Sequence, residues 1–308
     1  MGRADCRRFA QAFARAVRLY EASPEAIIAR GVLQLATGPR DAERFARIAA
    51  SDLFEPGDLA PTDAAEAAQR LGEPAPAALD QTTALALDPA PVLQAWAGPV
   101  RRAHVAGLGQ GETGWRLRDA GGEILAEADA VIVAAGPAAQ ALVPTLALRP
   151  VRGQASWAEP APPAPASAWG GYLIPMRSGV LFGATHDRDE TATEVRAADH
   201  ARNHETLAQR LPRAAARLAG LPLAGRAAVR ATTADRLPVA GDVGGLLVLT
   251  GFGSRGFSLA PLLAEHVAAL ALGAPSPLPI PLAALVEPGR FARRAAARRN
   301  GGAVMQDD

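Results

Sequence analysis

The chain has 308 residues, of which 49% are hydrophobic and 20% are charged, so it can bury the core of one large domain or of two ordinary domains. All 32 basic residues are arginines, which excludes reactions that need a lysine, such as Schiff-base catalysis. The net charge of +1 gives no general basic field of the kind that marks many nucleic-acid-binding proteins. A single cysteine, Cys6, excludes an intramolecular disulfide framework.

Two further features bear on where the protein works. No apolar run reaches the roughly 18 residues that a membrane-spanning helix needs. The amino-terminal residues are not followed by the apolar segment of a signal peptide. We therefore predict a cytoplasmic protein that does not insert into a membrane.

The first half of the chain predicts alternating helices and short strands. Apolar residues at helical spacing predict a helix from about Arg7 to Glu21. A continuous apolar run over 130–135 is typical of a buried parallel strand. The other elements expected here are a strand over 31–38, a helix over 41–50 with Asp41 as N-cap, a short helix over 62–71, a strand over 82–87 followed by a helix, and a meander of strands at 100–106, 114–118 and 123–127.

The second half has the same mixed character. Pro212 is expected to end a helix over 197–211, since proline cannot continue one. The remaining elements expected here are a strand over 151–158, a hairpin of strands 171–175 and 179–184, strands over 226–232 and 245–250, a helix over 257–272, and a basic helix over 290–299.

Three glycines, Gly251, Gly253 and Gly256, form a G-x-G-x-x-G pattern between a predicted strand and a predicted helix. Such glycines permit a tight turn and a close approach of a ligand to the backbone, and a helix N-terminus favours phosphate. A dinucleotide unit also needs a second strand with an acidic residue, but a proline-rich segment follows the helix. Three readings are open: a ligand-free turn, a complete dinucleotide site, and a loop that contacts a cofactor held mainly elsewhere. We favour the third.

Several stretches together resemble the D-amino-acid-oxidase/glycine-oxidase superfamily of flavoproteins, and within it the oxidase domain of the bifunctional enzymes that modify the wobble uridine of tRNA. The resemblance extends over nearly the whole chain. The matching stretches are AVIVAAG at 130–136, RPVRGQ at 149–154, GYLIP at 171–175, FGAT at 182–185, RATTADRLPVAG at 230–241, LTGFGSRG at 249–256, APLLAE at 260–265 and PGRF at 288–291.

The resemblance implies FAD as cofactor and a mixed α/β fold with α+β character. It implies an incomplete Rossmann-like FAD-binding domain, formed by residues 1–30, 88–148 and 230–308. An interleaved substrate domain with an antiparallel sheet would comprise residues 31–87 and 149–229. The family begins with a βαβ unit whose own glycine loop holds the flavin pyrophosphate, and this sequence has no such unit. We expect a truncated or mis-started chain, which by itself can be inactive. The alternatives are a flavin-free relative and a half that another polypeptide completes.

The family oxidises an amine next to a carboxylated carbon, passes a hydride to the flavin and releases the product after the imine hydrolyses. The resemblance implies that the carboxymethylaminomethyl group of tRNA wobble uridine becomes aminomethyl, with release of glyoxylate. Expected partners are tRNA or a small amine, and a methyltransferase domain or chain. The alternatives are an oxidase of free amino acids or sarcosine, and a flavin-free remnant or interaction protein.

The same resemblance assigns roles to single residues. Arg230 and Arg255 are candidates for binding the substrate carboxylate, because a guanidinium can bind it through two hydrogen bonds, and Tyr172 could donate a third. For each of them a surface or structural role is the alternative. Arg152, Gly153 and Gln154 are expected to mark the crossing into the substrate domain. The backbone groups expected to contact the flavin are those of Ala135, Gly136, Gly251, Phe252, Gly253, Ser254, Arg255 and Gly256.

Two weaker patterns complete the sequence analysis. His200 and His204 have a spacing that can bind zinc, but no third ligand is evident, so we predict no metal site and a solvated helix face. The arginines of the carboxyl-terminal segment could contact tRNA phosphates, and the alternative is a solvated terminal helix. These arginines are Arg290, Arg293, Arg294, Arg298 and Arg299.

Overall fold

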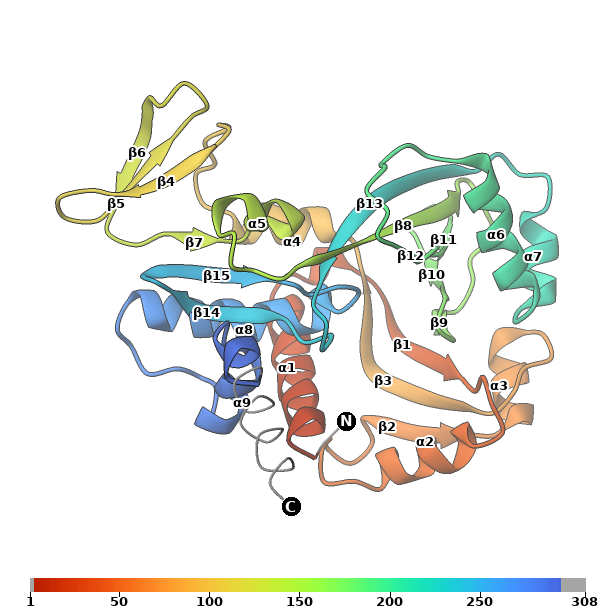
Figure 1. Cartoon of the computed structure of the whole chain (residues 1–308). Helices are drawn as coiled ribbons and strands as arrows, with labels where there is room; N and C mark the ends of the chain where they lie inside the picture. Colours follow the sequence, from red (N-terminus) through yellow and green to blue (C-terminus); the bar gives the residue numbers. More distant parts are fainter. Residues whose placement is uncertain (1–2, 295–308) are drawn as a thin grey trace, which may run out of the picture. The chain divides into compact units, whose positions relative to one another are not determined.

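A computed structural model of the chain describes the backbone of residues 3–294 and the side chains of residues 9–294. Helices and strands alternate along the chain, which confirms the mixed fold class (Figure 1). The structure separates into two compact units. The first comprises residues 1–12, 99–150 and 230–308, and the second comprises residues 13–98 and 151–229. Each unit is therefore assembled from segments far apart in the sequence.

The second unit is organised around a nine-stranded, mostly antiparallel sheet with the order β12-β8-β11-β10-β9-β1-β3-β2, in which β13 also pairs with β8. Its strands are β1 (Ile27–Leu35), β2 (Leu59–Thr62), β3 (Ala78–Leu87), β8 (Arg149–Ala158), β9 (Ser167–Ala168), β10 (Tyr172–Pro175), β11 (Val180–Gly183), β12 (Asp187–Arg188) and β13 (Ala224–Thr232). Its helical elements are η1 (Pro24–Ala26), α2 (Asp41–Ala49), α3 (Ala64–Leu71), α4 (Pro89–Trp96), α6 (Ala197–Ala208) and α7 (Pro212–Leu218). Helix α1 (Arg3–Glu21) begins in the first unit and ends in the second.

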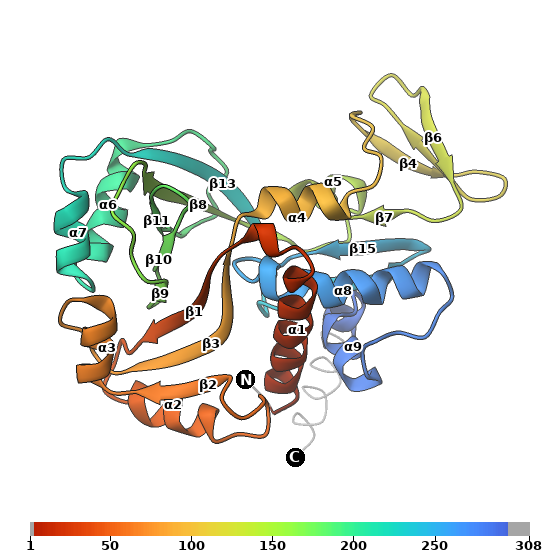
Figure 2. The same ribbon diagram turned by 180° about the vertical axis from the view of Figure 1, so that it is seen from behind.

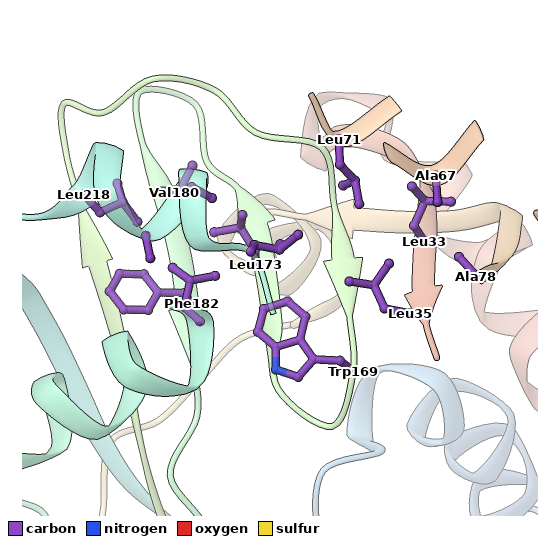
Figure 3. Close-up of a cluster of buried hydrophobic side chains, with 14 of the residues drawn as sticks. Leu33, Leu35, Ala67, Leu71, Ala78, Trp169, Leu173, Val180, Phe182 and Leu218 are labelled. Carbon is purple, nitrogen blue, oxygen red and sulfur yellow. The ribbon is translucent and has the colours of Figure 1, made fainter. Parts of the chain in front are cut away.

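A single apolar cluster forms most of the core of the second unit (Figure 3). Phe182 and Leu173 project from the β10–β11 hairpin and are almost completely buried. Leu33 and Leu35 extend the cluster along β1. Burying a large apolar side chain contributes about 1.5–3 kcal/mol, so this cluster holds together strands that are distant in the sequence.

Local signals explain where individual elements begin and end. Helix α3 starts after Asp63, whose carboxylate accepts a hydrogen bond from the Glu66 amide at 2.8 Å. It ends at Gly72, which has the left-handed φ of +69° that is typical of a helix C-terminus. Asp41 is not an N-cap as predicted, because Arg40 holds that position. The Asp41 carboxylate instead accepts hydrogen bonds from the preceding turn, at Thr37 and Gly38.

The first unit contains a small sheet with the order β14-β15-β7. Strand β15 (Leu246–Thr250) is antiparallel to β14 (Val239–Val243) and parallel to β7 (Ile132–Val133). Helix α8 (Gly256–Ala271) packs against the β14–β15 hairpin (Figure 2). A separate meander contains β4 (Gly107–Gln110), β5 (Trp115–Arg118) and β6 (Ile124–Ala128). The other helical elements are η2 (Gly136–Ala138), α5 (Ala139–Leu142) and α9 (Ile280–Val286).

Several predicted elements need correction. The first strand of the meander lies at 107–110 rather than 100–106. Pro212 ends no long helix but begins α7, where its fixed φ suits the first helical turn and its missing amide hydrogen costs nothing. The apolar run at 130–135 forms only a two-residue strand, in which Val133 is buried while Ile132 is 43% exposed. No helix among residues 3–294 is long and apolar enough to cross a bilayer.

Candidate cofactor and substrate site

The carboxyl ends of two parallel strands lie side by side in the first unit. Leu247 of β15 pairs with Ile132 of β7, and Val248 pairs with Val133. Beyond the strands, the Thr250 hydroxyl donates to the Gly136 carbonyl oxygen at 3.0 Å. The two segments predicted to contact a flavin, 135–136 and 251–256, are therefore neighbours. This edge of a sheet is where α/β proteins bind their ligands.

The loop between β15 and α8 needs glycine at two positions for steric reasons. Gly251 has φ +77°, and a Cβ there would lie 3.1 Å from the Thr233 Cγ2 atom. Gly253 has φ +57°, and its amide donates to the Ala231 carbonyl oxygen at 2.9 Å. Residues with a side chain rarely adopt such φ values. The loop is therefore held tightly against the end of β13 and the residue that follows this strand.

Gly256 lies in a different environment at the start of α8. A Cβ on Gly256 would meet only the Phe252 Cβ, at 4.0 Å, so the space beside this backbone is open. The N-cap residue Arg255 makes no side-chain capping bond, and the first turn of α8 has no acidic residue. The 16-residue helix therefore keeps its amino-terminal partial positive charge available. Open backbone at a positive helix end fits a cofactor that carries phosphate and carbonyl oxygens.

Arg255 combines partial burial with an unbalanced charge. Its guanidinium carbon lies 4.8 Å from the centre of the Phe9 ring, which fixes the side chain by a cation–π contact. Burial and the neighbouring Arg236 guanidinium both lower the pKa of Arg255. Within the described part of the chain, Arg255 makes no ion pair with an acidic side chain. Its side chain is thus available to an anionic ligand.

The other two predicted substrate residues lie in different units. Arg230 is half-buried near the end of β13, where this strand passes into the first unit, and the next residue, Ala231, accepts the bond from the glycine loop described above. The fold thus brings the backbone segments that carry Arg230 and Arg255 together. Tyr172 is half-buried at the start of β10 in the second unit, where it pairs with Gly183 and Ala168.

A turn over residues 233–237, which we call the Thr233 turn, was missed by the sequence analysis. Arg236 at its tip is exposed and has φ +60°. The Thr233 hydroxyl lies 2.7 Å from the Leu237 carbonyl oxygen, and the Leu237 amide donates to Asp235 Oδ1. No sequence pattern predicted a left-handed φ at Arg236, because glycine, asparagine and aspartate are the residues that usually adopt it.

Arg290 holds the Thr233 turn in place through bonds to Asp235 and Leu237. Its side chain is 3% exposed, with Nε 2.9 Å from Asp235 Oδ2 and Nη2 3.1 Å from Asp235 Oδ1. Arg290 also donates to the Leu237 and Val286 carbonyl oxygens. Both readings of Arg290, as a tRNA contact or as a solvated residue, were therefore wrong.

The other arginines of the carboxyl-terminal segment differ in what the structure shows of them. Arg293 pairs with Glu287 and Arg294 pairs with Asp235, so their charges are also partly neutralised. Arg298 and Arg299 lie outside the described residues.

Arg152 and Gln154 belong to a buried polar network in the second unit. Arg152 is fully buried and lies 2.6 Å from the Asp199 carboxylate. It also donates to the carbonyl oxygens of Ala192 and Glu194, and so fastens the segment before α6. A buried arginine with this set of partners has no capacity left for a ligand, which indicates a structural role.

The two histidines of α6 are also structural. His200 Nδ1 lies 2.8 Å from the Ser156 hydroxyl, and His204 Nε2 lies 3.0 Å from the Ala215 carbonyl oxygen. The solvated face predicted for them is therefore wrong. Among the described side chains, no group of three or more His, Cys, Asp or Glu residues is arranged to hold a metal ion.

Comparison with known proteins assigns the chain to a family. Residues 2–270 match the sequence pattern of the family described as FAD dependent oxidoreductase. The chain belongs to this family. Two curated relatives are both called "tRNA 5-methylaminomethyl-2-thiouridine biosynthesis bifunctional protein MnmC". The one from Caulobacter sp. (strain K31) is 58% identical over 93% of this chain and 49% of its own length. The one from Caulobacter vibrioides is 57% identical over 92% of this chain and 48% of its own length. The chain thus spans about half the length of the curated relatives it matches.

Two solved structures share the fold of this chain. Glycine oxidase from Geobacillus kaustophilus superposes with a TM-score of 0.74 at 21% identity, covering 88% of this chain and 81% of that one. L-proline dehydrogenase from P. horikoshii superposes with a TM-score of 0.77 at 20% identity, covering 92% of this chain and 83% of that one. These comparisons confirm the predicted family resemblance and the use of FAD in the family.

Proposed function

We propose that this chain is the oxidase part of a tRNA-modifying enzyme. In this proposal it oxidises the carboxymethylaminomethyl group of wobble uridine to aminomethyl and releases glyoxylate. The observation that carries the proposal is the juxtaposition of the segment that carries Arg230 with the glycine loop that carries Arg255, through the bond from Gly253 to Ala231. The names of relatives that are more than half identical to the chain support tRNA as substrate.

FAD would be held by backbone groups of the first unit. The amides at the start of α8 would face the isoalloxazine and ribityl part, and residues 135–136 would lie near the adenosine part. Gly136 has φ +57° with no atom within 4 Å of a built Cβ, so its backbone also has free space beside it. When bound, FAD supplies a hydride acceptor for the C–H bond next to the amine.

The substrate would be oriented by its carboxylate. Arg230 is the first candidate ligand, since its guanidinium can bind both carboxylate oxygens, and Arg255 is the second. The role expected for Tyr172, a hydroxyl donor to the same carboxylate, stays a prediction from the sequence. An amine that binds in its neutral form needs no general base, so the absence of a histidine from this proposed set is consistent with the reaction.

A matched pair of variants tests the role of Arg230. Arg230→Gln should lower kcat/KM by about 10- to 100-fold, because a charge-assisted hydrogen bond to a carboxylate is lost. Arg226→Gln removes the same charge from an exposed position on the same strand and should leave kcat/KM unchanged. Steady-state kinetics on tRNA that carries the carboxymethylaminomethyl group measures both. Equal values for the two variants would contradict this role.

The relatives are bifunctional by name, and this chain matches about half of each. We propose that the other half corresponds to the methyltransferase partner expected from the sequence. The competing function, oxidation of a free amino acid or sarcosine, is tested by offering glycine and sarcosine in the same assay. Faster turnover of either than of the modified tRNA would favour it.

A further inference from the structure

Arg236 occupies a position that the fold holds rigidly in a strained conformation. Its φ of +60° is one that residues with a side chain rarely adopt. Such a conformation persists only where the surroundings enforce it, and it is found most often at ligand sites. The Thr233 turn provides that enforcement through Asp235, which Arg290 and Arg294 both contact from the same unit.

The charge around Arg236 is unbalanced. The nearest carboxylate in the sequence, Asp235, is committed to Arg290, Arg294 and the Leu237 amide. Arg236 itself makes no ion pair with any acidic residue of the described chain. The loop that carries Arg255 lies against the Thr233 turn, since a Cβ on Gly251 would lie 3.1 Å from the Thr233 Cγ2 atom. The charge of Arg236 helps to lower the pKa of Arg255, and the Phe9 ring contacts the Arg255 guanidinium.

Two arginines on adjoining segments, neither of them ion-paired with an acidic side chain among the described residues, can bind one anion together. Arginine binds phosphate and carboxylate through paired N–H donors. The exposure of Arg236 distinguishes between these two ligands. The half-buried Arg230 suits the small carboxylate beside the reacting carbon, whereas an exposed arginine suits a phosphate on the outside of a polynucleotide.

We propose that Arg236 and Arg255 together bind a backbone phosphate of the RNA that carries the reacting base. This inference rests on the proposed function, and it assigns Arg230 to the carboxylate and Arg255 to the phosphate. Neither the family name nor the sequence pattern pointed to Arg236.

The first experiment tests the anion site without RNA. Unfolding temperatures of the full chain are measured with increasing inorganic phosphate, at constant ionic strength set with chloride. A ligand that binds the folded state raises the unfolding temperature, so the wild type should respond. Arg236→Gln and Arg255→Gln should lose the response. Arg102→Gln, which removes an exposed arginine of the same unit that has no ion pair with the described residues, should keep it. An undiminished response in Arg236→Gln overturns the proposal.

The second experiment tests the source of the phosphate. The dissociation constant of an anticodon stem-loop RNA is measured against salt concentration for the same variants. Arg236→Gln should weaken binding by about 5- to 20-fold and reduce the log–log salt slope by about one, while Arg102→Gln should match the wild type. Wild-type affinity and slope in Arg236→Gln overturn the proposal. If the wild type binds phosphate but no RNA, the result contradicts tRNA as the substrate and also contradicts RNA as the source of the phosphate. The anion site itself would still be supported by the phosphate response.

Discussion

Arg236 has a left-handed backbone conformation that glycine adopts without steric cost. We expect Arg236→Gly to raise the free energy of unfolding by about 0.5–1 kcal/mol, because relief of strain exceeds the added entropy of the unfolded chain. It would also remove the repulsion with Arg255. Urea unfolding measures the change. Ala234→Gly is the control, since Ala234 in the same turn has no positive φ and should be destabilised. Destabilisation of both variants would contradict the claim that the backbone of Arg236 is strained.

Asp235 is the residue on which the Thr233 turn depends. Asp235→Asn leaves the Arg290 guanidinium buried without a counter-charge, and we expect a loss of about 3 kcal/mol of unfolding free energy. Glu287→Gln removes one half of an exposed ion pair with Arg293 and should have little effect. Urea unfolding near pH 7 compares the two variants. Similar losses of unfolding free energy would show that the buried pair of Asp235 and Arg290 stabilises the protein no more than the exposed pair does.

The same carboxylate predicts a pH dependence. Burial alone would raise the pKa of Asp235, but hydrogen bonds from Arg290 and the Leu237 amide, together with the charge of Arg290, hold it well below its usual range. A lowered pKa in the folded state stabilises the protein above the unfolded pKa of about 4, and this contribution is lost as the pH falls below that value. The stability difference between wild type and Asp235→Asn should therefore be constant from about pH 5 to 8 and shrink in stronger acid. A constant difference down to about pH 3 would contradict this linkage.

At the residue scale the sequence could not separate arginines with a structural role from candidate ligands. Since every basic residue is arginine, residue type could not separate Arg152 and Arg290, which are buried in structural networks, from Arg236, which is exposed and has no ion pair among the described residues. Only the three-dimensional position of the carboxylates distinguishes these cases. The role of Arg230 stays a prediction.

At the scale of elements, two glycines in the loop between β15 and α8 should respond differently to substitution by alanine. Gly251→Ala should lower stability by about 1–2 kcal/mol, because φ is +77° and the new Cβ would lie 3.1 Å from Thr233 Cγ2. Gly256→Ala should leave folding intact, since the space beside Gly256 is open. It should nevertheless lower the FAD content, because the methyl group would occupy the face proposed for the cofactor.

Two measurements on the Gly256→Ala variant check this expectation. The unfolding temperature reports folding, and the flavin released per chain on denaturation reports FAD content. A stable variant with wild-type FAD content would show that this face does not contact the cofactor. Loss of FAD together with loss of stability would point to a structural role for Gly256 instead.

Elements with a strong local signal were predicted correctly, and elements without one were not. The β10–β11 hairpin and α8 have clear turn and periodicity signals, and both lie close to the predicted ranges. Strand β14 was missed, because its sequence contains Gly241 and Asp242, which are poor strand formers. Its pairing with β15 comes from tertiary packing under α8, which no local pattern reveals.

At the scale of the whole molecule, the motif order identified the family before any single motif could. The G-x-G-x-x-G pattern alone left three readings open. Its position after β15, beside the end of β7, supports the reading of a loop that contacts a cofactor held mainly elsewhere. The assignment of the two units to cofactor and substrate stays a prediction, since it depends on ligands rather than on the chain.

The most direct test of the central claim is the modification state of tRNA in cells. In a strain that lacks the gene for this chain, mass spectrometry of digested tRNA should show accumulation of the carboxymethylaminomethyl nucleoside and loss of the aminomethyl products. Restoring the wild-type gene should reverse the change, and restoring Arg230→Gln should do so only in part. An unchanged nucleoside profile in the deletion strain would contradict the claim that this protein oxidises the wobble uridine of tRNA.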